Sequence, residues 1–414
     1  MINLIDLERV ISDQAGKFKE KEFGILRDVD FDKYLNSRQI TVISGVRRSG
    51  KSTLLKQFSR HFPKFYYFNF DDERLVDFKV SDFQTLMIAF KKAYKANVIL
   101  LDEIQNVPMW ERFVRRIFEE DYKIFITGSN ANLLGSELAT HLTGRYLKLE
   151  LFPFSFAEFL RFRDINYKDL GSETQAAILK SFDLYLTDGG FPEYVRSGNK
   201  AIISQIYEDI IYRDLLTRFK IREVKNFKLL INYAFSNFTR ELSYNSLKNT
   251  LGFKSATTVK NFLEFTKESY LMFELYKFDY SLKKQYVSNK KVYVIDNGLR
   301  NATAFSFSED RGKLLENLVF LEFLRRGKEI YYYKDIKECD FLVKEKNKIT
   351  EACQVTCLLD KTNEKRELPG LLDAMERFKL KQGMVITENQ EETRKIGGKA
   401  IKIVPAWKWL LQKE

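Results

Sequence analysis

Cysteine, histidine and proline are scarce in this sequence of 414 residues. The three cysteines, Cys339, Cys353 and Cys357, are too few for a disulfide framework and fit a reducing compartment. The two histidines, His61 and His141, lie far from the cysteines and from each other, which excludes a Cys/His zinc spacing and a His-based triad. With 6 prolines and 19 glycines, collagen-like and low-complexity classes are also excluded.

Long apolar runs are absent too. No stretch approaches the roughly 18 apolar residues that span a bilayer, so we expect a soluble, cytoplasmic chain without a membrane partner. Hydrophobic residues make up 44% of the sequence, enough for several cores, and the length suggests two to four domains. The 69 Lys and Arg exceed the 57 Asp and Glu and give a net charge of +12, which suits a polyanionic partner but also occurs in ordinary basic proteins.

A short β-rich run, a glycine loop and a helix-forming run follow one another near residue 50. The loop has the P-loop spacing, in which a glycine is followed by four residues and then by Gly-Lys-Ser. Its main-chain N–H groups and the helix N-terminus favour phosphates, the lysine suits the β- and γ-phosphates, and the serine hydroxyl suits Mg²⁺. The predicted ATP-binding residues are Gly45, Val46, Arg47, Arg48, Ser49, Gly50, Lys51, Ser52 and Thr53.

Two carboxylates follow an apolar run, as expected of a buried parallel strand that ends beside a ligand. Residues 98–101 are apolar, and Asp102 and Glu103 come directly after them. We predict that Asp102 holds Mg²⁺ together with Ser52, and that Glu103 is the general base that activates the attacking water.

Two further segments supply candidates for the same chemistry. A third predicted strand, residues 123–127, leads into Ser129 and Asn130, which either contact the γ-phosphate or the water or form a plain turn. Arg145 is a candidate arginine finger for a neighbouring subunit's nucleotide, which would require a homo-oligomer, or else an ordinary surface arginine. The alternation of strands and helices up to residue 154 predicts an α/β fold with a doubly wound parallel sheet.

The sequence resembles the bacterial and archaeal AAA+ ATPases that carry a C-terminal DUF4143 domain. The resemblance implies an ATPase core over residues 1–154, a helical lid over 155–235, a winged helix over 236–290, and a domain like the PD-(D/E)XK nuclease fold over 291–414. It also implies that Pro192, in a GxP element, contacts the nucleotide base, although a proline-ended turn explains this element as well. The matching segments are GVRRSGKSTLL, NFDDERL, LLDEIQNVPMWERFVRRI, ITGSNANLL, HLTGRY, PFSFAEFL, GGFPEYV, IYRDLL, KVYVIDNGLR, LLENLVFLEFLRR and ECDFLV.

The nuclease-like domain departs from the pattern that nuclease activity needs. Glu316 fits the metal-binding helix glutamate and Asp340 fits the strand aspartate, but Gln354 falls where the pattern has a glutamate. A neutral amide is a poor substitute for an anionic Mg²⁺ ligand, and Glu351 replaces it only if the strand register differs. We therefore expect no nuclease activity.

Lysines gather around the third helix and the wing-like turn of the predicted winged helix, as in domains that bind DNA phosphates. A set of solvated surface lysines without a partner role is the simpler explanation. The lysines of this group are Lys254, Lys260, Lys267, Lys283, Lys284, Lys290 and Lys291.

Together these features predict a Mg²⁺-dependent enzyme that hydrolyses ATP to ADP and phosphate and couples its nucleotide state to DNA or a protein partner. The alternatives are a nucleotide-gated adaptor with negligible turnover and an ATP-regulated nuclease.

Overall fold

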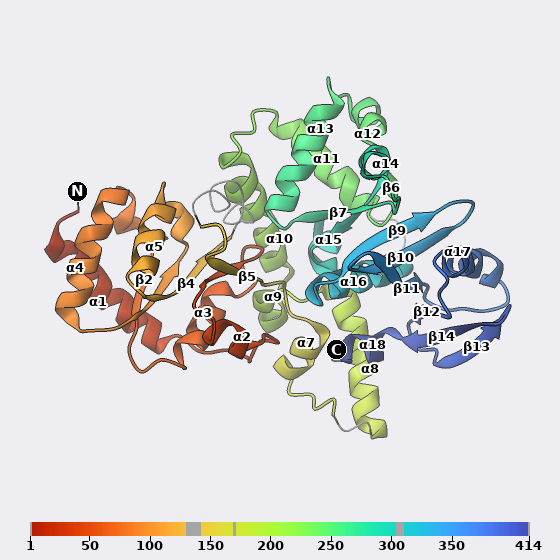
Figure 1. The fold of residues 1–414 in the computed structure, drawn as a ribbon, viewed down its shortest axis with the longest axis horizontal. Coiled ribbons are helices and arrows are strands. Elements are labelled where there is room, and N and C mark those ends of the chain that lie inside the picture. The colour runs from red at the N-terminus through yellow and green to blue at the C-terminus, as the bar shows by residue number, and fades with distance from the viewer. Residues whose placement is uncertain (1, 130–141, 169–170, 304–309, 413–414) are drawn as a thin grey trace. The chain divides into compact units, whose positions relative to one another are not determined.

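The computed structural model describes residues 2–129, 142–168, 171–303 and 310–412. The chain divides into two compact units, Met1–Phe152 and Pro153–Glu414, and Figure 1 shows the elements of each. In the described part of the chain, no helix combines the length and apolar character that a membrane span requires.

The first unit contains a sheet of five parallel strands in the order β2-β3-β4-β1-β5. β4 lies between β1, which leads into the phosphate loop, and β3, which ends at the acid pair. This arrangement confirms the α/β fold with a parallel sheet of the P-loop AAA+ type. The strands are β1 (Ile40–Ser44), β2 (Tyr66–Asn69), β3 (Val98–Asp102), β4 (Lys123–Gly128) and β5 (Tyr146–Glu150).

Helices cover both faces of this sheet, which is why β3 carries apolar side chains on both of its faces. Ile99 and Leu101 of β3 pack into one core with residues of α4 and α5. Val98 and Leu100 alternate with them and pack into a second core with residues of α3. The helices are α1 (Leu4–Glu20), α2 (Phe31–Leu35), α3 (Lys51–Ser59), α4 (Phe83–Ala93) and α5 (Trp110–Glu119).

The second unit begins with a helical region that leads into a small antiparallel sheet. The sheet has the order β6-β8-β7, and β6 and β7 both pair with β8. The helices are α7 (Phe156–Phe162), α8 (Ser172–Asp188), α9 (Pro192–Ser197), α10 (Lys200–Asp209), a π-helix (Ile210–Thr217), α11 (Val224–Ser236), α12 (Tyr244–Leu251), α13 (Ala256–Glu268) and α14 (Leu282–Val287). The strands are β6 (Glu241–Leu242), β7 (Met272–Tyr276) and β8 (Lys290–Val294).

A six-stranded mixed sheet with the order β13-β14-β12-β11-β10-β9 completes the second unit. β9, β10 and β11 form an antiparallel meander, and β12 pairs parallel to β11 after the crossover helix α17. The helices are α15 (Asn297–Thr303), α16 (Arg311–Arg325), α17 (Glu364–Arg377) and α18 (Ala406–Leu411). The strands are β9 (Glu329–Lys334), β10 (Glu338–Glu345), β11 (Lys348–Val355), β12 (Gln382–Thr387), β13 (Glu392–Ile396) and β14 (Lys399–Pro405).

Candidate nucleotide-binding site

Two positions of the loop between β1 and α3 require glycine, each for a different steric reason. A Cβ atom on Gly45 would lie 2.1 Å from the carbonyl oxygen of Leu151, so a side chain does not fit there. Gly50, at the N-cap of α3, has a φ of 97°, which places it in the left-handed region that favours glycine. The sequence spacing therefore produces the turn that directs the loop into the helix N-terminus.

Lys51 is the first residue of α3, and its side chain folds back over the loop. The residue is 5% exposed, and its ammonium group donates to the carbonyl oxygens of Gly45, at 3.2 Å, and Val46, at 3.0 Å. A buried ammonium group held at the mouth of a helix N-terminus is a ready cation for phosphate oxygens.

Arg27 supports the loop from outside it. Its guanidinium is buried and donates to the carbonyl oxygens of Ser49 and Phe152, each at 2.8 Å. The guanidinium thereby holds the loop against the chain that follows β5. Sequence analysis did not identify Arg27, because it lies 18 residues or more before the motif and no local pattern marks it.

The predicted metal ligands lie side by side. The hydroxyl of Ser52 donates to Asp102 Oδ1 at 3.1 Å, and the hydroxyl of Tyr67 donates to Asp102 Oδ2 at 3.3 Å. Mg²⁺ in phosphate sites takes one or two protein oxygen ligands together with the substrate's own, so a hydroxyl beside a carboxylate fits this ion. Burial, followed by the nearby charge of Asp102, raises the pKa of Tyr67 well above its usual value, which keeps this hydroxyl a donor.

Glu103 has an unusual backbone conformation for a residue with a side chain. Its φ is 53°, and its N–H donates to the hydroxyl of Thr127 at 3.0 Å. Gln105 donates a side-chain hydrogen bond to the Glu103 carboxylate. Burial raises the pKa of Glu103 above its usual value, which brings this carboxylate closer to the range of an effective general base.

Thr127 joins the two acids and is a second residue that sequence analysis missed. Its hydroxyl donates to Asp102 Oδ1 and accepts the N–H of Glu103, and its side chain is fully buried at the end of β4. Its signal in the sequence is a polar residue that follows the apolar run of β4. In the turn that follows, Ser129 is buried directly after β4, and Asn130 lies outside the described residues.

Arg145 is not brought to the loop of this site. Arg145 precedes β5, and its carbonyl oxygen accepts the N–H of Ile40 at the start of β1. It therefore lies at the opposite end of the sheet from the loop, about 16 Å along the strand at roughly 3.3 Å per residue. Pro192 begins α9 in the second unit, two residues after Gly190, whose N–H donates to Asp296 at 2.7 Å. Its contact with a nucleotide base stays a prediction.

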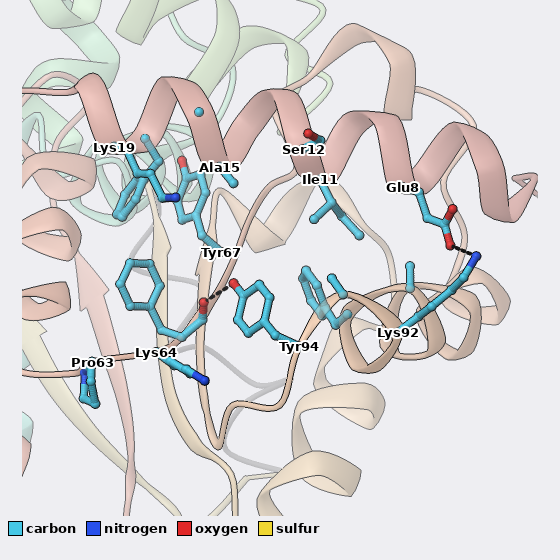
Figure 2. Close-up of a pocket in the computed structure, with 16 residues that line it drawn as sticks. Glu8, Ile11, Ser12, Ala15, Lys19, Pro63, Lys64, Tyr67, Lys92 and Tyr94 are labelled. Atoms are coloured by element: carbon cyan, nitrogen blue, oxygen red, sulfur yellow. Dashed lines mark hydrogen bonds and ion pairs between the residues drawn. The ribbon is translucent and has the colours of Figure 1, made fainter.

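A separate hollow of about 800 Å³ lies between α1 and α4 (Figure 2). Tyr67 lines it, and Figure 2 shows Tyr94 and the ion pair of Lys92 with Glu8 along the same hollow. Its lining is mainly apolar and contains no part of the glycine loop, so it is distinct from the phosphate site.

Three family models match successive parts of the chain. A model described as an AAA domain matches residues 37–160. Two models described as domains of unknown function, DUF8612 and DUF4143, match residues 179–310 and 311–409.

Two relatives match almost end to end. The uncharacterized protein MJ1544 of Methanocaldococcus jannaschii is 38% identical over 428 residues, which cover 98% of this chain and 95% of the relative. An uncharacterized protein of Haemophilus influenzae is 31% identical over 407 residues, which cover 93% and 96%.

Solved structures of AAA+ proteins are similar in part. AMPPCP-bound DnaA from Aquifex aeolicus has 13% identity, with 57% of this chain and 86% of that chain covered and a TM-score of 0.26. Cdc6p from Pyrobaculum aerophilum has 9% identity, with 70% and 91% covered and a TM-score of 0.24. On the strength of the family models and the two relatives, the chain belongs to the family of AAA+ proteins with a C-terminal DUF4143 domain.

Proposed function

We propose that this protein is a Mg²⁺-dependent ATPase whose nucleotide state controls a partner-binding second unit. The observation that carries the proposal is the convergence of Lys51 with its loop and of Ser52 with the Asp102–Glu103 pair. In this assignment Lys51 and the loop N–H groups bind the phosphates, and Ser52 and Asp102 hold Mg²⁺. Glu103 accepts the proton of the attacking water. Bound Mg²⁺ supplies charge stabilisation for the phosphate oxygens.

Thr127 and Arg27 act through other groups in this proposal. Thr127 fixes the backbone of Glu103 and one oxygen of Asp102, so that metal and base keep a constant separation. Arg27 keeps the carbonyl group of Ser49 occupied on the outer side of the loop. Both are positioning residues. Arg145, at the far end of the sheet, serves the reaction only if a second copy of the chain presents it to the nucleotide.

Two buried lysines on one helix provide a matched test of nucleotide binding. We expect Lys51→Met to weaken the binding of a fluorescent ATP analogue about ten- to a hundredfold, because a charged hydrogen bond contributes about 1.5–3 kcal/mol. Lys56→Met is the control, since the Lys56 ammonium is equally buried but donates to the carbonyl oxygen of Phe18 at 2.6 Å. Its loss is expected to lower the Tm and leave the affinity unchanged. Absence of binding by the wild type contradicts the proposal.

The second unit offers the partner surface that we propose. The order α11, β6, α12, α13, β7, β8, with β6 and β7 both on β8, supports the winged-helix interpretation of residues 236–290. Lys254, Lys260 and Lys267 are exposed on it. The connection between β7 and β8 is the exposed helix α14, which carries Lys283 and Lys284.

Lys290 and Lys291, which the sequence groups with these lysines, do not lie on the surface as either explanation of the group assumes. Both lie on β8 and are buried, at 4% and 2% exposed, because the strand is the centre of the small sheet. Lys283 and Lys284 of α14 do lie on the surface, and exposed aromatic side chains flank them. Tyr280 is 78% exposed and Tyr286 is 64% exposed. Lysines beside exposed aromatic rings are the combination that binds and stacks on nucleic acid.

Charge reversal on α14 tests DNA as the partner. We expect Lys283→Glu/Lys284→Glu to weaken binding to a DNA oligonucleotide, and to reduce the slope of log K against log salt by about 2, one per phosphate contact. Lys346→Glu/Lys348→Glu, at the exposed turn after β10 and the exposed first residue of β11, changes the net charge equally and is the control. Equal behaviour of the two variants would assign the partner role to a protein.

A further inference from the structure

An ammonium group lies at the centre of the acids that the nuclease pattern singled out. Lys291 of β8 is 2% exposed, and its Nζ lies 3.0 Å from Glu316 Oε1 on α16. It also lies 3.0 Å from Asp340 Oδ1 and 2.6 Å from Glu338 Oε1, both on β10. Three carboxylates from two elements thus converge on one cation that a third element supplies.

Several other groups of the protein donate to the acids of this cluster or lie beside them. The hydroxyl of Tyr293 donates to Glu316 Oε1 at 2.7 Å, and the N–H of Val355 donates to Asp340 Oδ2 at 3.0 Å. Gln354, where the nuclease pattern has an acid, donates to Glu367 at 2.9 Å and accepts the N–H of Asp340 at 3.3 Å. Its amide is therefore occupied by neighbouring groups of the protein.

The cluster does not fit the Mg²⁺ of a nuclease. The three carboxylate oxygens stand 2.6–3.0 Å from their common centre, which is the hydrogen-bond distance of an ammonium group. Mg²⁺ requires oxygen ligands at about 2.0–2.1 Å. Burial alone lowers the pKa of Lys291, but the charges of Glu316, Asp340 and Glu338, with Tyr293 beside them, outweigh it and raise this pKa above its usual value. Among the described residues, no group of three or more His, Cys, Asp and Glu is placed to hold a metal ion.

We propose that the Lys291 ammonium is a built-in replacement for the metal of a nuclease-like centre, which makes the C-terminal domain a metal-free, non-cleaving module. The replacement comes from β8, the central strand of the sheet that carries α14, so the former centre now joins two sheets. Two further contacts connect the same two sheets. The hydroxyl of Tyr332 on β9 donates to the carbonyl oxygen of Asn289 at 2.7 Å, and Lys334 of β9 pairs with Glu241 of β6. The proposal is independent of the ATPase assignment.

Lys290 and Lys291 form a matched pair for the test, because both are buried on β8 but Lys290 donates to the carbonyl oxygen of Tyr286 and contacts no carboxylate of the cluster. Unfolding of the second unit is followed by the fluorescence of Trp407 and Trp409 in a Trp110→Phe background. We expect Lys291→Met to lower the Tm by about 10 °C, since Glu316 and the buried Asp340 lose the cation that they share, and Lys290→Met to lower it less. Adding Glu316→Gln and Asp340→Asn to Lys291→Met is expected to recover most of the loss.

Metal binding provides the second measurement. With Asp102→Asn present to silence the nucleotide site, we expect millimolar Ca²⁺ or Mn²⁺ to leave the Tm unchanged with Lys291 in place. The same ions are expected to raise the Tm of the Lys291→Met variant, in which Glu316, Glu338 and Asp340 no longer face the Lys291 ammonium group. If Lys291→Met alone does not fold, folding of the triple variant supports the proposal. Divalent-ion binding or plasmid nicking by a protein that retains Lys291, lost in Asp340→Asn, overturns it, as does equal behaviour of the two lysine variants.

Discussion

Phosphate release by the Glu103→Gln variant is expected to fall by a factor of about 10² to 10⁴ at saturating ATP, because that is the range that a positioned general base contributes. Binding of ATP is expected to persist, since glutamine keeps the size of the side chain and Lys51 and the loop stay in place. A variant that binds but does not turn over is also the form in which a partner of the ATP state is captured.

The pH profile adds a readout that a purely structural role does not change. Burial raises the pKa of Glu103 above its ordinary value of 4.5, and the base must be ionised to accept a proton. We therefore expect wild-type kcat to rise with pH through a midpoint above 4.5, and Glu103→Gln to lack that limb. Glu111→Gln on α5 is the control, because this carboxylate is also buried but lies outside the acid pair. If Glu103→Gln turns over at the wild-type rate, the protein is better described as an adaptor.

The parallel sheet and its phosphate loop were predictable because their signals are local. Apolar runs of four or five residues predicted strands buried on both faces, and the glycine spacing predicted a turn that admits no Cβ at Gly45. The side-by-side placement of Ser52 and Asp102 followed from topology, since parallel strands present their carboxyl ends at one edge.

The supporting contacts were not predictable, because they join residues that are distant in the sequence. Arg27 reaches Phe152, and Thr127 reaches Glu103, through the packing of the whole unit. The lysine pattern of β8 misled for the same reason. Lys290 and Lys291 are close to exposed lysines in the sequence, but they pair with β6 and β7, and Lys291 also reaches Asp340, 49 residues away.

A buried asparagine network provides a prediction with a large effect on stability. Asn317 of α16 is fully buried and donates to the carbonyl oxygen of Val294 at 3.0 Å and to Asn297 Oδ1 at 2.9 Å, and it accepts the N–H of Val294 at 2.9 Å. Asn297, also fully buried, donates to the carbonyl oxygens of Leu186 at 2.8 Å and Leu314 at 3.0 Å. Two side-chain amides therefore connect α8, β8, α15 and α16.

Asn317→Asp keeps the shape of the side chain but replaces a donor of two hydrogen bonds by an anionic oxygen that faces two acceptors. An uncompensated buried charge costs about 3–5 kcal/mol, so we expect the Tm of the second unit to fall by about 10 °C. Asn301→Asp on the exposed side of α15 is the matched control and is expected to leave the Tm nearly unchanged.

The pH dependence of the fall in Tm caused by Asn317→Asp shows whether the buried charge is its cause. A buried carboxyl group with one oxygen facing two acceptors has a pKa raised above its unfolded value, so the native state binds the proton more tightly than the unfolded chain. Protonation of the introduced carboxyl group stabilises the native state fully at a pH below the pKa of that group in the unfolded chain. This stabilisation is lost as the pH rises through the raised pKa of the group in the native state. The difference in Tm between Asn317→Asp and the wild type should therefore be larger at pH 8 than at pH 5, again measured through Trp407 and Trp409. A difference that is the same at both pH values would attribute the loss to packing and not to the missing donors.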